Sequence, residues 1–162
     1  MKNIFPYSRQ SVDNKDIQEV IKTLKSDIIA RGAKISEFER KLSKFVGAKY
    51  AVAVNSATAG LHISCLALGV KKGDLVWTVP NTFAATANAA LYCGAKIDFV
   101  DIEYSTGNID VNLLEDKLKN SKQKPRVLIP VHFAGQPTEQ ERILKLSKKY
   151  GFKIIEDASH SL

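Results

Sequence analysis

The sequence has few cysteines and histidines, and they are not grouped. Cys65 lies in a helical apolar pattern, Cys93 directly precedes Gly94, and the three histidines are far apart in the chain. No Cys-x-x-Cys spacing occurs, so nothing indicates a disulfide framework or a zinc site. We therefore expect two free thiols and no metal site.

Long apolar runs are also lacking. No stretch approaches the roughly 18 consecutive apolar residues that a membrane-spanning helix needs. Residues 1–6 contain no apolar core of signal-peptide length. We therefore expect a cytoplasmic protein with no membrane partner.

The positive charges are not concentrated. Lysine and arginine number 24 against 17 acidic residues, a formal net charge of +7, which can indicate a polyanion partner. The lysines are instead scattered over several expected helices and loops, without interleaved aromatic residues. This distribution favours a solvated surface, and we expect no nucleic-acid partner.

Short apolar runs alternate with helical patterns along the whole chain, and linker-like or repeated segments are absent. The 162 residues, 44% of them hydrophobic, suffice for one cored domain. The expected strands are residues 50–54, 75–79, 96–100, 127–131 and 152–156. The expected helices are residues 14–26, 37–46, 57–68, 82–91, 111–119 and 139–150, with a capping box at Ser36 and Glu39 before the second. Because crossover helices join parallel strands, we predict an α/β fold with a mostly parallel sheet and helices on both faces.

One strand-turn-helix segment carries small polar residues where a ligand can approach. Asn55 or Ser56 can cap the following helix, which leaves the amides of Ala57, Thr58 and Ala59 directed outward. The helix dipole favours an anion such as phosphate at this position. An ordinary serine-capped helix would show the same residues, so this segment alone leaves both interpretations open.

Four polar or aromatic clusters each follow an expected strand. They are residues 55–58, 81–83, 132–133 and 157–160. The carboxyl ends of parallel strands share one edge of a sheet, where ligands bind in α/β proteins. We therefore predict a single site with a phosphate end and an acidic end.

Four sequence blocks together resemble the DegT-type nucleotide-sugar aminotransferases, which are fold-type I enzymes that use pyridoxal 5'-phosphate (PLP). The blocks are Asn55-Ser56-Ala57-Thr58-Ala59, Asn81-Thr82-Phe83-Ala84-Ala85-Thr86, Ile129-Pro130-Val131-His132-Phe133-Ala134-Gly135 and Ile155-Glu156-Asp157-Ala158-Ser159-His160. The resemblance runs over essentially the whole chain. It implies an N-terminal helix and linker in residues 1–35, and part of the cofactor-binding large domain of such an enzyme in residues 36–162.

The resemblance also implies cofactor-binding roles at the phosphate end. Ser56, Ala57 and Thr58 would bind the cofactor phosphate, through backbone amides and the Thr58 hydroxyl. Phe83 would stack on the pyridine ring. Packing in the core is the alternative, which its position just past a strand end disfavours.

At the acidic end, the resemblance implies two catalytic residues that also contact the cofactor. Asp157 would pair with the pyridinium nitrogen and keep the ring protonated. A helix-capping aspartate after a strand is the alternative. His160 would lie near the phenolic oxygen of the cofactor.

Resemblance places the substrate side in the N-terminal segment. Tyr7 and the linker residues Asp27, Ile28, Ile29 and Ala30 would lie near the sugar or the partner subunit of a homodimer. Alternatively, Tyr7 packs at the amino terminus, and the two isoleucines anchor the linker to the core.

The implied reaction transfers an amino group from an amino acid, usually glutamate, to a nucleotide-linked 4-keto-6-deoxy sugar. Within that branch, the enzymes that make the amino-sugar precursor of pseudaminic acid are the most similar. The family's Schiff-base lysine lies beyond the segment matched by residues 156–160, and no lysine here has a matching context. We therefore expect a chain that ends before this lysine. Its alternatives are a non-catalytic cofactor-binding or dimerisation module and a nucleotide-binding domain, the latter disfavoured because no G-x-G-x-x-G motif follows a strand.

Overall fold

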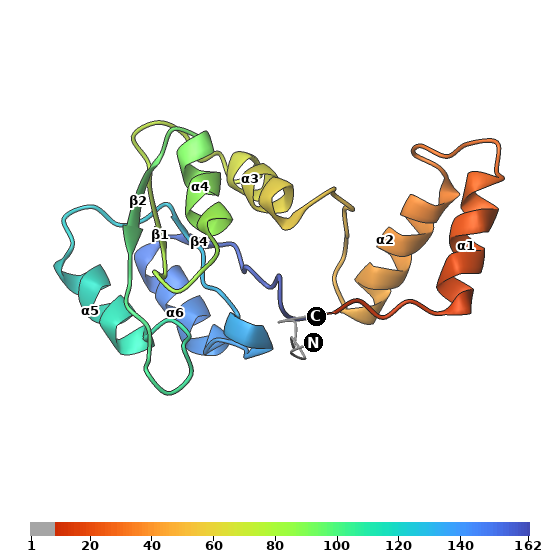
Figure 1. Ribbon diagram of the computed structural model, residues 1–162. Helices are drawn as coiled ribbons and strands as arrows, with labels where there is room; N and C mark the ends of the chain where they lie inside the picture. The colour runs from red at the N-terminus through yellow and green to blue at the C-terminus, as the bar shows by residue number, and fades with distance from the viewer. Residues whose placement is uncertain (1–8) are drawn as a thin grey trace, which may run out of the picture. The chain divides into compact units, whose positions relative to one another are not determined.

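A computed structural model describes residues 9–162, which form two compact units (Figure 1). The first unit ends at Ala53 and the second comprises Val54–Leu162. The predicted boundary after residue 35 falls inside helix α2 (Ala33–Phe45), whereas the two compact units divide after Ala53. The assignment of residues 36–162 to a cofactor-binding large domain stays a prediction.

The first unit contains helices α1 (Asn14–Leu24) and α2. Asp13 caps α1 and forms a capping box with Asp16. The capping box predicted at Ser36 and Glu39 is wrong, because α2 already begins after Gly32. Glu39 Oε1 instead accepts a hydrogen bond from the Ala53 amide at 2.8 Å.

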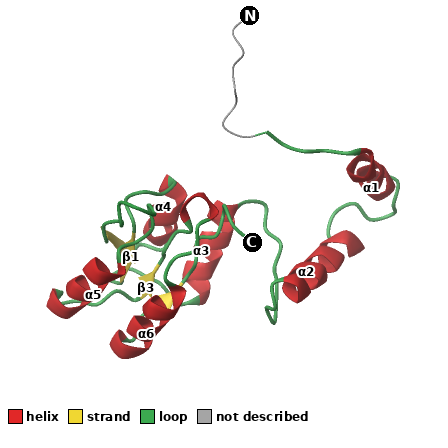
Figure 2. Ribbon diagram, turned by 90° about the horizontal axis from the view of Figure 1, so that it is seen from below, coloured by secondary structure: helices red, strands yellow, loops and turns green. Residues whose placement is uncertain are grey.

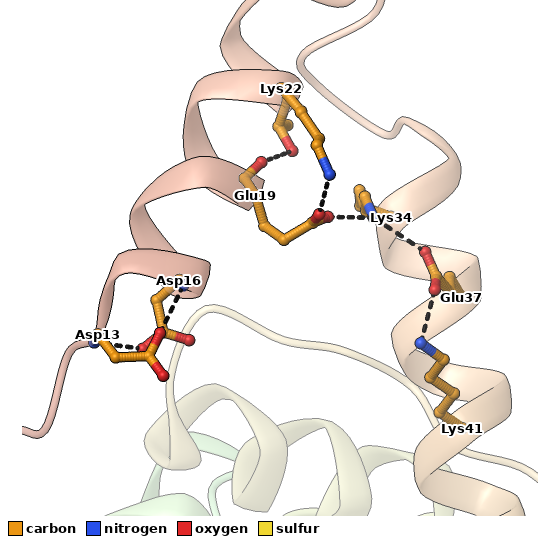
Figure 3. A network of polar contacts seen from close by, with 8 residues as sticks. Asp13, Asp16, Glu19, Lys22, Lys34, Glu37 and Lys41 are labelled. Carbon is orange, nitrogen blue, oxygen red and sulfur yellow. Dashed lines mark hydrogen bonds and ion pairs between the residues drawn. The ribbon is translucent and has the colours of Figure 1, made fainter.

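Ion pairs join the two helices of the first unit (Figure 3). Glu19 on α1 lies 2.6 Å from Lys22 and 2.7 Å from Lys34, which is on α2. Glu37 lies 3.2 Å from Lys34 and 2.7 Å from Lys41. Neither helix has a fully buried residue, so these polar contacts and partly covered side chains connect them.

The second unit contains the four-stranded parallel sheet. Its strands are β1 (Leu75–Thr78), β2 (Lys96–Phe99), β3 (Val127–Leu128) and β4 (Lys153–Ile154), in the order β2-β1-β3-β4. Its helices are α3 (Ala57–Ala67), α4 (Ala84–Tyr92), α5 (Val111–Asn120) and α6 (Gln140–Tyr150), with a short 3₁₀ turn η1 (Phe133–Gly135). The predicted α/β fold is confirmed.

Adjacent residues of each central strand point to opposite faces of the sheet. Val76 and Val127 pack in one core cluster with residues of α3 and α4. Trp77 and Leu128 pack in a second cluster with residues of α5 and α6, which lie side by side (Figure 2). Helices thus cover both faces, as the nearly continuous apolar strands predict.

Residues 50–54 do not form the predicted strand. No strand of the described residues pairs with this run, and Tyr50 and Val52 are exposed. A β-strand needs hydrogen bonds from a neighbouring strand, which sequence pattern alone does not supply.

The last two strands are shorter than the expected five residues. Pro130 has no amide hydrogen to donate, which interrupts the ladder after β3. Pairing resumes at a bridge between Val131 and Asp157, where the His132 amide donates to the Asp157 carbonyl at 3.0 Å. This bridge fixes the backbone on either side of the predicted site.

Candidate active site

A cleft of about 580 Å³ lies at the carboxyl ends of β1, β3 and β4. It is lined by members of all four predicted clusters, among them Thr58, Phe83, His132 and Asp157. Ala57 and His160 also line it. The structure therefore brings together the residues predicted to share one edge of the sheet.

The amino end of α3 faces this cleft. Ser56 is the cap, and its hydroxyl accepts a hydrogen bond from the Ala59 amide at 3.2 Å. The amides of Ala57 and Thr58 have no hydrogen-bond partner among residues 9–162. Ser56 therefore shapes the turn, while Ala57 and Thr58 present the donors and dipole that an anion would use.

Phe83 is a cleft residue and not a core residue. It is the cap of α4, which begins two residues later than predicted, and its side chain is 80% exposed. This exposure rules out packing in the core. Phe83 gives the cleft a flat apolar surface to which a planar ligand can stack.

Asp157 is the most strongly fixed side chain of the cleft. It is only 6% exposed, and a turn follows it in residues 158–162, while the helix-cap alternative stays a prediction. Its Oδ1 accepts from the Ser159 amide at 3.3 Å and from the Ser159 hydroxyl at 2.6 Å. Its Oδ2 accepts from the Thr86 hydroxyl at 2.7 Å. A carboxylate offers about four acceptor positions, so three bonds leave room for one more donor.

His160 also lines the cleft, in the turn that follows Asp157. A hydrogen bond of 2.9 Å from the Ser161 amide to the Ala158 carbonyl closes this turn. The side chain of His160 is accessible to a ligand, because the residue is exposed.

The predicted substrate residues lie elsewhere in the chain. Tyr7 falls outside the described residues. The residues Asp27, Ile28, Ile29 and Ala30 belong to the first unit, in the connection between α1 and α2. Ile28 and Ile29 are 64% and 61% exposed, so neither is buried within the first unit. Their predicted contact with a sugar stays a prediction.

Three residues of the site region were assigned no individual role from the sequence: Thr86, Asn108 and His132, the last of which was expected only as a member of the cluster 132–133. Thr86 follows Thr82 by four residues in the helix predicted over residues 82–91, and this spacing was the available signal. In the structure Thr82 precedes α4, and its hydroxyl lies 2.7 Å from that of Thr86. His132 is buried, and its Nε2 has no hydrogen-bond partner in the described part of the chain. Asn108 gives no signal, because its partners are 25 to 29 residues away.

Residues 9–162 contain neither a metal-binding cluster nor a membrane-spanning helix. No group of three or more histidine, cysteine, aspartate or glutamate side chains is placed to hold a metal ion. None of the described helices has the length and apolar character required to cross a bilayer. Both cysteines are free thiols, as predicted.

Comparison with known proteins identifies relatives for nearly the whole chain. The chain is 46% identical over 156 residues to UDP-4-amino-4,6-dideoxy-N-acetyl-beta-L-altrosamine transaminase of Campylobacter jejuni subsp. jejuni serotype O:2, covering 96% of this chain and 41% of that protein. The chain thus spans about two fifths of the length of the curated relatives it matches.

Two solved structures share the fold closely. Helicobacter pylori PseC, an aminotransferase of pseudoaminic acid biosynthesis, superposes with a TM-score of 0.90 at 33% identity, covering 98% of this chain and 42% of PseC. The PLP form of Spr1654 from Streptococcus pneumoniae, a sugar aminotransferase by its description, gives 0.88 at 31% identity, covering 98% and 43%. The model of the DegT/DnrJ/EryC1/StrS aminotransferase family matches residues 10–162, and the chain belongs to this family.

Proposed function

We propose that the cleft binds PLP, and that the protein carrying this chain transfers an amino group from glutamate to a nucleotide-linked 4-keto-6-deoxy sugar. We further propose that it acts as a cytoplasmic homodimer. One observation carries the proposal: the fixed, buried carboxylate of Asp157 lines the same cleft as the amino end of α3 and the exposed ring of Phe83. These three features match the charged nitrogen, the phosphate and the planar ring of PLP.

At the phosphate end, Ala57 and Thr58 contribute backbone amides and the Thr58 hydroxyl. Their small side chains leave space for the phosphate to reach the helix end, where the dipole stabilises its negative charge. Ser56 contributes indirectly, because its hydroxyl is already engaged with the Ala59 amide.

At the acidic end, Asp157 accepts a hydrogen bond from the ring nitrogen and keeps it protonated. PLP, when bound, supplies an electron sink for the carbanion that forms as the α-proton of the amino acid leaves. Phe83 orients the ring by stacking, and His160, which also lines the cleft, lies near the phenolic oxygen of the cofactor.

The finer substrate assignment rests on relatives and on the resemblance. The Campylobacter relative is named for a UDP-linked 4-amino-4,6-dideoxy sugar, and PseC for pseudoaminic acid biosynthesis. We therefore propose the amino-sugar precursor of pseudaminic acid as the product. Tyr7, Asp27, Ile28, Ile29 and Ala30 are proposed to contact the sugar or the partner subunit.

The test uses the natural protein that carries this chain. We expect the cofactor-free protein to bind PLP, to form one equivalent of 2-oxoglutarate from L-glutamate, and then to aminate a UDP-linked 4-keto-6-deoxy sugar. D-glutamate serves as the control and should give no 2-oxoglutarate. PLP binding without 2-oxoglutarate would contradict transamination and favour the non-catalytic module, while no PLP binding would contradict the whole proposal.

A further inference from the structure

A chain of two hydroxyl groups leads from the wall of the cleft to Asp157. Thr86 is completely buried, and its hydroxyl donates to Asp157 Oδ2 at 2.7 Å. The Thr82 hydroxyl, on the cleft wall, lies 2.7 Å from the Thr86 hydroxyl. The hydrogen bond between Thr86 and Asp157 joins two residues that are 71 positions apart in the sequence.

Proton counting fixes the direction of these bonds. A threonine hydroxyl has a single hydrogen, and an ionised carboxylate can only accept. Thr86 gives its hydrogen to Asp157, so Thr82 must be the donor in the bond between the two threonines. The order is therefore Thr82 to Thr86 to Asp157, and hydrogen bonds in such a chain strengthen one another.

Position in the helix indicates that the Thr86 hydroxyl serves this contact. The sequence of α4 is otherwise dominated by alanine, the best helix former, and a β-branched residue lowers helix propensity. A buried hydroxyl without a partner would also destabilise the fold. Apolar packing alone would therefore be served better by alanine at this position.

We infer that Thr86 is a positioning residue, which together with Thr82 holds the Asp157 carboxylate in the orientation that meets the ring nitrogen. This inference rests on the proposed function. Ser159 fixes Oδ1 from the turn after β4, and Thr86 fixes Oδ2 from α4. Because both oxygens are held from different elements, rotation of the carboxylate is restricted, and one acceptor position remains for the ring nitrogen.

The test compares four forms of the natural protein that carries this chain: wild type, Thr86→Val, Thr86→Ser and Thr138→Val. Valine keeps the shape of threonine and removes the donor, while serine restores the hydroxyl. Thr138 is the matched control, because its buried hydroxyl has no hydrogen-bond partner among residues 9–162 and does not line the cleft. Thermal unfolding of each variant confirms folding.

The primary readout is the ¹⁵N NMR shift of PLP labelled at the ring nitrogen, which reports ring protonation without turnover. Thr86→Val should move the signal toward that of a neutral ring and slow single-turnover 2-oxoglutarate formation by about 10- to 100-fold, as expected for a misplaced catalytic group. Thr86→Ser and Thr138→Val should match wild type. A wild-type signal in Thr86→Val would overturn the inference alone. No protonated signal in wild type would instead refute the proposed pairing of Asp157 with the ring.

Discussion

Asn108 Oδ1 accepts a hydrogen bond from the Phe133 amide at 2.9 Å. The Nδ2 group of the same side chain donates to the carbonyls of Gln136 and Pro137, at 3.0 and 3.1 Å. Asn108 thereby holds the loop that follows β3, in which Ala134 has the left-handed backbone angle φ of 51°. A non-glycine residue in this conformation costs free energy, and the Asn108 contacts help to offset it.

Replacing Asn108 by alanine should therefore destabilise the second unit. We expect the free energy of unfolding to fall by about 1–3 kcal/mol, because a buried side chain loses three hydrogen bonds at once. Denaturant unfolding measures this change. The comparison variant Asn108→Asp keeps the acceptor for the Phe133 amide but places a buried carboxylate oxygen against two carbonyls, so its loss should be at least as large. An unchanged denaturation midpoint in the alanine variant would contradict the proposed role of Asn108 in holding the loop after β3.

Much of the site was predictable, because its polar and aromatic clusters follow strands whose carboxyl ends lie at the same edge of the sheet. Parallel strands end at one edge of a sheet, so the clusters beginning at Asn81, His132 and Asp157 were expected to meet, and they do. The amino end of α3 joins them although the strand predicted before it is absent. The helix cap at Ser56 depends only on local sequence, which explains why that prediction is confirmed.

Other features depend on contacts that a single sequence does not reveal. Residues 50–54 have the sequence pattern of a strand, but no strand of the described residues pairs with them. The capping box predicted at Ser36 does not form, because the helix already begins at Ala33, after its cap Gly32. The bond between Thr86 and Asp157 joins distant segments, so no local pattern indicates it. Asn108 follows a glycine turn and resembles an ordinary loop residue.

At the phosphate end, Thr58→Val should weaken PLP binding. Loss of one hydrogen bond to a charged group costs about 1.5–3 kcal/mol, or roughly 10- to 150-fold in the dissociation constant. Titration of the cofactor-free protein with PLP measures this, and Thr58→Ser is the control that keeps the hydroxyl. Equal affinities in wild type and the valine variant would remove Thr58 from the proposed phosphate site.

The ion pairs between α1 and α2 predict acid sensitivity of the first unit. Hydrogen bonds and charges from Lys22 and Lys34 lower the pKa of Glu19 from 4.5 to about 2. Because the folded-state pKa is depressed, this stabilisation is present above pH 4.5 and is lost as the pH falls toward 2. Amide hydrogen exchange of peptides from α1 and α2, corrected for intrinsic rates, should show falling protection over this range.

Two comparisons separate this effect from general acid unfolding. Glu19→Gln should flatten the pH dependence, whereas Asp27→Asn should not, since Asp27 has no ion-pair partner within the described residues. Added salt should weaken the effect, because the groups are exposed. Identical profiles in wild type and Glu19→Gln would show that these pairs contribute nothing measurable.

The two thiols should differ in reactivity. Burial, with a smaller contribution from Cys93, raises the pKa of Cys65 from 9.0 to about 11, and burial also raises the pKa of Cys93. Since the thiolate is the reactive form, iodoacetamide at pH 8 should modify the less buried Cys93 first. Peptide mass spectrometry measures both rates, and denaturant should equalise them. Faster modification of Cys65 in the folded protein would contradict the described core.

The most direct measurement concerns Asp157. Asparagine at this position keeps the size of the side chain and removes its charge, so it should retain most PLP binding through the amino end of α3. Single-turnover formation of 2-oxoglutarate from L-glutamate should slow by several orders of magnitude in the Asp157→Asn form of the natural protein, because the ring is no longer held protonated. A near wild-type rate in this variant, with PLP bound, would contradict the proposed role of Asp157 and the assignment of the cleft.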